Sequence, residues 1–183
     1  MNEQTSNMHY VCTPNEARDL IRRQARYWVA NCGCRESLGF VCSRSKADVC
    51  LQFFPQSASG GQELREIDRL EAEALVDYAQ QKGLVCRPFR DPQTFQQVEG
   101  ICFCCDDCCA YFLHPEEESC DKGSLAECTD MARCDSCGDC LEACHFQARL
   151  MVEGSLALKK ELCYGCGFCV EACPQEAIRM VSR

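Results

Sequence analysis

Cysteines are the residues of this chain that could do chemistry, because they make up 21 of its 183 residues. Eight of them form two copies of the spacing C-x2-C-x2-C-x3-C, which begin 29 residues apart. The first copy contains Cys134, Cys137, Cys140 and Cys144, and the second contains Cys163, Cys166, Cys169 and Cys173. Three closely spaced thiolates can bind one face of an iron-sulfur cubane, and the fourth reaches the other cluster. The repeat therefore predicts two [4Fe-4S] clusters.

The same spacing predicts which thiolates share a cluster. With crossed ligation, one cluster is held by Cys134, Cys137, Cys140 and Cys173, and the second by Cys163, Cys166, Cys169 and Cys144. Zinc is the alternative metal, but the cysteine pairs of zinc modules usually lie further apart in sequence. Because such clusters accept and release single electrons, the expected chemistry is electron transfer.

The segment from residue 130 to 181 resembles the bacterial two-cluster ferredoxin domain. Cys173-Pro174 matches the final Cys-Pro of that family, whereas His145 occupies the equivalent position of the first repeat. We expect His145 to be an exposed residue in the first turn of a helix rather than a ligand. Each repeat is predicted to contain a cysteine loop, a short helix and a strand.

Nine further cysteines fall into two blocks upstream of the repeats. They are Cys32, Cys34, Cys42, Cys50, Cys102, Cys104, Cys105, Cys108 and Cys109. Soft thiolates select iron-sulfur clusters, Zn²⁺ or Cu(I), and we expect at least one additional iron-sulfur centre here. A structural zinc site and buried or reactive thiols are the alternatives. The isolated thiols are expected to be small buried hydrophobes: Cys12, Cys86, Cys120 and Cys128.

The order of these upstream blocks resembles a set of 4Fe-4S proteins from anaerobes. The matching positions are Cys32 to Arg35, Cys42, Cys50, Gly83 to Val85 and Ile101 to Cys105. Asp107 stands where those proteins often have another cysteine, so their number of ligands does not carry over. This resemblance implies iron-sulfur binding more firmly than any particular reaction.

Two helices and several strands must position these thiols. Thr13 to Glu16 reads as a capping box with proline at the first helical position, which predicts a helix to about Arg26. Asp68 opens a second helix that stops at Gly83. Its predicted apolar stripe consists of Leu70, Ala74, Leu75 and Tyr78. Strands are expected at residues 27–30 and 84–86, a hairpin with a glycine turn at 150–158, and a loose connection at 56–61.

The predicted fold class is α+β, with two domains. A small cysteine-rich α+β domain is expected at residues 1–113, a linker at 114–129 and a two-cluster ferredoxin-like domain at 130–183. Each domain is too small to rely on its apolar core alone, so metal is expected to contribute to folding.

The charge of the chain favours a basic protein partner. Residues 91–183 contain 17 acidic and 7 basic residues, and the whole chain has a formal charge of −9. This acidic balance argues against a nucleic-acid partner, and the sequence predicts neither a membrane-spanning segment nor a secretory signal.

The odd number of cysteines argues against a disulfide scaffold and indicates a reducing cytoplasm. With three histidines and no phosphate loop or Ser/His/Asp set, no catalytic residue is expected.

We therefore interpret the sequence as an electron-transfer protein, an accessory or small subunit of an anaerobic redox complex whose partner presents a basic docking face. One alternative is a reductase with an open iron site in the upstream centre. The other is a metal-handling or cluster-assembly module in which the clustered upstream thiols exchange metal.

Overall fold

The computed structural model describes residues 7–37, 42–55, 63–114 and 120–183 of the chain. Its N-terminal half contains β1 (His9–Tyr10), α1 (Pro14–Arg22), β2 (Tyr27–Ala30), α2 (Gly33–Ser37), β3 (Cys50–Gln52), β4 (Arg65–Ile67), α3 (Arg69–Gln81), β5 (Val85–Arg90), β6 (Val98–Cys104), α4 (Ala110–Leu113) and β7 (Cys120–Asp121). The C-terminal half contains β8 (Leu125–Thr129), α5 (Asp139–Glu142), β9 (Arg149–Val152), β10 (Ser155–Leu158), the 3-10 helix Lys160–Leu162, α6 (Phe168–Glu171) and β11 (Ile178–Ser182). The predicted α+β class is confirmed.

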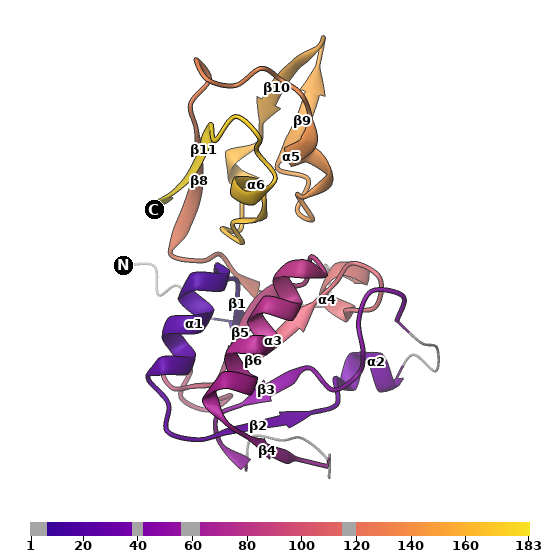
Figure 1. The fold of residues 1–183 in the computed structure, drawn as a ribbon, viewed down its shortest axis with the longest axis vertical. Helices are drawn as coiled ribbons and strands as arrows, with labels where there is room; N and C mark the ends of the chain where they lie inside the picture. The colour runs from indigo at the N-terminus through magenta and orange to yellow at the C-terminus, as the bar shows by residue number, and fades with distance from the viewer. Residues whose placement is uncertain (1–6, 38–41, 56–62, 115–119) are drawn as a thin grey trace.

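A seven-stranded sheet in the order β4-β2-β3-β6-β5-β1-β7 forms the N-terminal half. Its pairings are antiparallel, except that β1 and β7 run parallel. α1 packs against α3, and both helices contact β5. Figure 1 shows the two helices side by side on one face of this sheet. The largest buried side chains lie between these helices and the sheet. They include Ile21, Leu51, Leu84 and Ile101.

The capping residues begin both long helices as predicted. Thr13 and Asp68 each accept a hydrogen bond from the backbone N–H three residues on, and the glutamates at those positions bond back to the cap. The first helix ends at Arg22 rather than near Arg26, because the hydroxyl of Tyr27 donates to the carbonyls of Ile21 and Gln24 and closes the turn.

The buried face of α3 differs in part from the predicted stripe. Leu75 is buried and Tyr78 packs against the core, as predicted, but Leu70 is 73% exposed. The other buried residues of the helix are Ala72, Val76 and Ala79. Both sets have helical spacing, so the pattern alone allowed either face.

The C-terminal half consists of short elements around the two cysteine repeats. β9 and β10 form the expected antiparallel hairpin, whose turn residues Glu153 and Gly154 both have positive φ. β11 pairs antiparallel with β8. Each repeat contains a four-residue helix that follows a glycine with positive φ, Gly138 before α5 and Gly167 before α6.

The segment expected to be a linker, 114–129, carries β7 and β8, which extend the sheets of the two halves. The domain boundaries at 113 and 130 stay a prediction. The expected loose connection at 56–61 lies outside the described residues. Within the described ranges, no helix has the length and apolar character needed to cross a membrane.

Candidate metal centres

The two repeats enclose two separate cavities in the C-terminal half. The first cavity is lined by Cys134, Cys137, Cys140 and Cys173. The second cavity is lined by Cys144, Cys163, Cys166 and Cys169. Each cavity therefore combines three cysteines of one repeat with the last cysteine of the other. This grouping places four thiols around each of two spaces, which is the donor set that a [4Fe-4S] cluster requires.

Backbone groups donate to the cysteine that each cavity takes from the other repeat. The N–H of Ala148 donates to Sγ of Cys144 at 3.3 Å, and the N–H of Ala177 donates to Sγ of Cys173 at 3.3 Å. The two contacts occupy equivalent positions in the two repeats. Hydrogen bonds to ligand sulfurs stabilise the thiolate and help to set the potential of an iron-sulfur cluster.

A buried ion pair lies between the two cavities. Arg149 donates to the carboxylate of Glu127 at 2.6 Å, and both residues line the second cavity. Arg149 also donates to Sγ of Cys140, in the first cavity, at 3.4 Å. Although burial opposes its charge, the neighbouring sulfur of Cys169 and the contacts with Cys140 and Glu127 raise the pKa of Arg149. One permanent positive charge is thus shared by both sites.

Sequence reasoning missed this pair. The arginine is the first residue of β9, where its charge reads as solvated, and Glu127 lies in the segment that was expected to be a linker. Comparison of the two repeats contained a signal for the arginine. Arg149 follows Ala148 in the first copy, whereas the apolar Ile178 follows Ala177 in the second.

The nine upstream cysteines converge into two groups, and each group draws on both sequence blocks. In the first, which we call the three-thiol cluster, Cys42, Cys105 and Cys108 are buried, and their sulfurs all lie within 4.8 Å of one another. Sγ of Cys105 is 3.6 Å from Sγ of Cys42 and 3.2 Å from Sγ of Cys108.

The other six thiols form a continuous row of sulfur contacts, which we call the six-thiol row. In order of contact they are Cys32, Cys34, Cys109, Cys104, Cys102 and Cys50. His9 stands beside the row, with Nε2 4.0 Å from Sγ of Cys102. Hydrogen bonds from Cys109 and Cys32 lower the pKa of Cys34, so the row favours a thiolate even without metal.

Each group also contains one buried arginine. Arg35 donates to the carbonyl of Phe103 at 3.1 Å and to Sγ of Cys105 at 3.8 Å. Arg87 donates to Sγ of Cys104 at 3.6 Å and of Cys109 at 3.3 Å. Within the described residues, Nε and Nη1 of Arg35, and Nε and Nη2 of Arg87, are buried without a hydrogen-bond partner. A buried guanidinium needs a compensating anion, so both thiol groups fit an anionic metal-thiolate centre.

An aromatic contact joins the six-thiol row to the second cavity. Tyr164 and Phe146, which line that cavity, stack with ring centroids 4.5 Å apart. Tyr111 packs on both rings at centroid distances of 6.2 and 6.4 Å. The guanidinium of Arg87 lies 4.1 Å above the ring of Tyr111. Sequence reasoning missed these residues, although each aromatic lies within two positions of a cysteine.

His145 belongs to this contact between the halves and is not exposed, contrary to expectation. Its side chain is 7% exposed, and its ring packs against Phe112 and Phe168. Nδ1 lies 3.7 Å from a carboxylate oxygen of Asp106. The N-terminal half covers the surface on which a free ferredoxin domain would expose this residue.

The isolated cysteines divide into two kinds. Cys12 and Cys86 are buried, as expected, and face each other across a β-bridge. Burial raises the pKa of Cys86 to about 12, so its thiol is neutral and unreactive at physiological pH. Cys120 and Cys128 are only partly buried.

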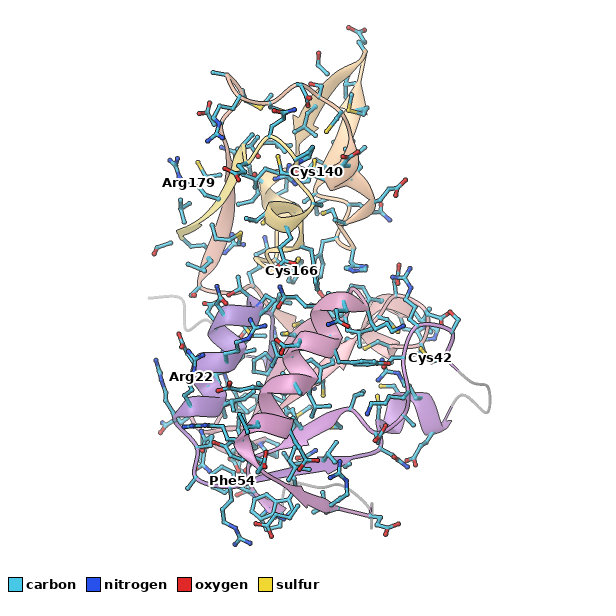
Figure 2. The ribbon with its side chains drawn as sticks, in the orientation of Figure 1. Arg22, Cys42, Phe54, Cys140, Cys166 and Arg179 are labelled. Carbon is cyan, nitrogen blue, oxygen red and sulfur yellow. The ribbon has the colours of Figure 1, made fainter. Side chains whose placement is uncertain are left out.

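Figure 2 shows Cys166 at the junction between the two halves, Cys140 farther into the C-terminal half and Cys42 near one edge of the N-terminal half. The comparison with known proteins concerns the domain that contains Cys140 and Cys166.

Residues 133–178 match the family described as the 4Fe-4S dicluster domain. No curated protein and no solved structure is significantly similar to the chain. The chain therefore contains a 4Fe-4S ferredoxin-type domain at its C-terminal end, which supports an iron-sulfur electron-transfer role.

Proposed function

We propose that this protein is a cytoplasmic electron-transfer protein that works as an accessory or small subunit of an anaerobic redox complex. In this proposal, two [4Fe-4S] clusters occupy the first and second cavities, each with the four cysteines that line it. A further iron-sulfur centre occupies the six-thiol row. When bound, these clusters supply reversible one-electron chemistry without proton transfer.

The residues around the two cavities fit such clusters. Each cavity offers four thiols, and in each the cysteine from the other repeat accepts a backbone N–H, from Ala148 or Ala177. Arg149 adds a positive charge beside both, which offsets the negative charge of a thiolate-bound cluster. Backbone and side chains thus provide the hydrogen bonds and the charge compensation on which cluster potentials depend.

The observation that carries the proposal is the contact that Tyr164, Phe146 and Tyr111 make between the second cavity and Arg87. Tyr111 packs edge to face on Tyr164, which stacks on Phe146, and Arg87 donates to two sulfurs of the six-thiol row. The contact links the two thiol groups through buried Arg87 and Tyr111 and the half-buried rings of Phe146 and Tyr164. A protein in which the upstream thiols served only the local fold would not require this connection.

The opposite end of the C-terminal half suits docking to a basic partner. Cys137, in the first cavity, is exposed. Asp135, Asp139 and Glu142 lie on the same cysteine loop and helix and are also exposed. Carboxylates around an accessible thiolate would steer a partner that presents lysines and arginines, and the rate of encounter would then fall with rising salt.

An anaerobic redox titration followed by electron paramagnetic resonance tests the proposal. The full chain is expected to show two one-electron signals from the C-terminal half and a third that disappears in the Cys104→Ala/Cys109→Ala variant. Cys12→Ala is the matched control, because it removes a buried thiol that touches neither group. If the double variant kept all its iron and every signal, the six-thiol row would not hold a redox centre. The proposed electron transfer through that row would then be refuted.

A further inference from the structure

We propose that the three-thiol cluster is the binding site of a single zinc ion, separate from every iron-sulfur centre of the chain. The ligands are the thiolates of Cys42, Cys105 and Cys108. This inference does not depend on the proposed electron transfer, because it rests on a different set of residues and a different geometry.

The sulfur spacing carries the first step of the argument. Four sulfurs placed tetrahedrally around one metal at about 2.3 Å lie about 3.8 Å from one another. The measured separations of 3.6 and 3.2 Å are close to that value and slightly shorter. In a cubane each thiolate binds a different iron, so the ligand sulfurs must stand further apart.

The rest of the chain provides an internal comparison. Among the described residues, which include all 21 cysteines, no other three candidate ligands place their atoms within 4.8 Å of one another. The eight repeat cysteines line their two cavities, four in each, and no three of them meet that limit, as expected for a polynuclear cluster. Neighbouring sulfurs of the six-thiol row contact each other in turn, but no three of them gather within 4.8 Å. The three-thiol cluster thus differs from both groups in the way that a site for one ion would.

Charge provides the second, independent observation. Arg35 is 6% exposed, and its guanidinium contacts Cys105 while two of its nitrogens are buried without a partner in the described part of the chain. Three thiolates and one Zn²⁺ carry a net charge of −1, which this guanidinium neutralises. A buried guanidinium is costly unless an anion lies beside it, and a zinc-thiolate centre would supply that anion.

The surroundings also fit an ion that joins distant segments. The carboxylate of Asp107 accepts hydrogen bonds from the N–H and hydroxyl of Ser43 at 2.9 and 3.0 Å, and so links the loop of Cys42 to the turn that carries Cys105 and Cys108. Among the described residues no fourth side chain gathers with the three sulfurs, so a water molecule would complete the coordination. The ion would join the loop that contains Cys42 to the end of β6, 63 residues away in sequence, as structural zinc sites do in small domains.

Zinc-edge X-ray absorption on the full chain is the decisive experiment, because it detects zinc whatever iron is present. The protein is purified anaerobically from cells supplied with both iron and zinc. We expect one zinc per chain with three sulfur neighbours at about 2.3 Å and one lighter ligand. The Cys108→Ala variant should lose that zinc and keep its iron, whereas the control Cys86→Ala should keep both.

Two results would overturn the inference. Loss of iron rather than zinc in Cys108→Ala would assign the cluster to an iron-sulfur centre. Zinc that is absent, or that survives in Cys108→Ala but leaves in Cys134→Ala, would show that the three-thiol cluster does not bind it. Failure of the proposed electron transfer is distinguishable from failure of this inference. It would appear in the iron signals of the Cys104→Ala/Cys109→Ala variant and not in the zinc content.

Discussion

Replacing Arg149 by methionine should lower the reduction potential of at least one of the two clusters proposed for the C-terminal half. The guanidinium donates to Sγ of Cys140 at 3.4 Å. Adding a metal-sulfur bond of about 2.3 Å places the nearest metal roughly 6 Å from the guanidinium. At an effective dielectric constant of about 20, one unit charge at that distance stabilises an added electron by about 3 kcal/mol. For a one-electron couple this energy corresponds to about 120 mV.

The sign of the shift follows from charge alone. Reduction adds a negative charge, so the loss of Arg149 disfavours the reduced state and makes the potential more negative. Glu127→Gln removes the opposing charge of the same pair, whose atoms are 2.6 Å apart, and should shift the potential in the positive direction. Arg149→Lys keeps the charge and is the matched control for packing.

Voltammetry of the anaerobic full chain, with iron content measured in parallel, provides the assay. The expected order of potentials is Arg149→Met below wild type and Glu127→Gln above it, with Arg149→Lys close to wild type. Equal shifts in Arg149→Met and Arg149→Lys, or no shift in either at full iron content, would refute the electrostatic reasoning.

Three further predictions follow from local geometry. Gly165→Ala should strongly destabilise the fold around the second cavity, because φ is +87° and the new Cβ would lie 2.2 Å from the carbonyl oxygen of Leu125. The control Gly154→Ala adds its Cβ in open space and should cost only about 1 kcal/mol of stability. Urea titration followed by cluster absorption compares the two variants. Cys86 should resist alkylation at pH 8 until the chain unfolds. Since its pKa is about 12 when folded and near 9 when unfolded, this thiol should also make stability fall as pH rises from 9 toward 12, which urea midpoints would detect and which Cys86→Ala should abolish. Removing iron should abolish amide-exchange protection in β9 and β10, because the four-residue helices beside them are too short to be stable alone; unchanged protection would contradict this.

Local sequence signals predicted the elements that depend on a few adjacent residues. The capping boxes at Thr13 and Asp68 begin α1 and α3, and Glu153-Gly154 forms the turn of the β9–β10 hairpin. The repeat likewise predicted a short helix and a strand after each cysteine loop. These features are set by backbone conformation and capping within one turn of chain, so they can be inferred without the tertiary fold.

Contacts between distant segments could not be predicted in the same way. The division of the upstream cysteines depends on how β6 and the turn after it pack against the loop that contains Cys42, and the two blocks gave no pairing. His145 is buried because the N-terminal half covers it. Arg35, Arg87 and Arg149 each lie among sulfurs in the fold, which their local sequence did not indicate.

Iron content of paired cysteine variants tests the crossed ligation of the two clusters most directly. Each lost [4Fe-4S] cluster removes about four irons. Cys134→Ala/Cys173→Ala should therefore lose about four irons, like either single variant, whereas Cys163→Ala/Cys173→Ala should lose about eight. The opposite pattern, with about eight irons lost from the first pair and about four from the second, would mean that each repeat binds its own cluster and would contradict the account.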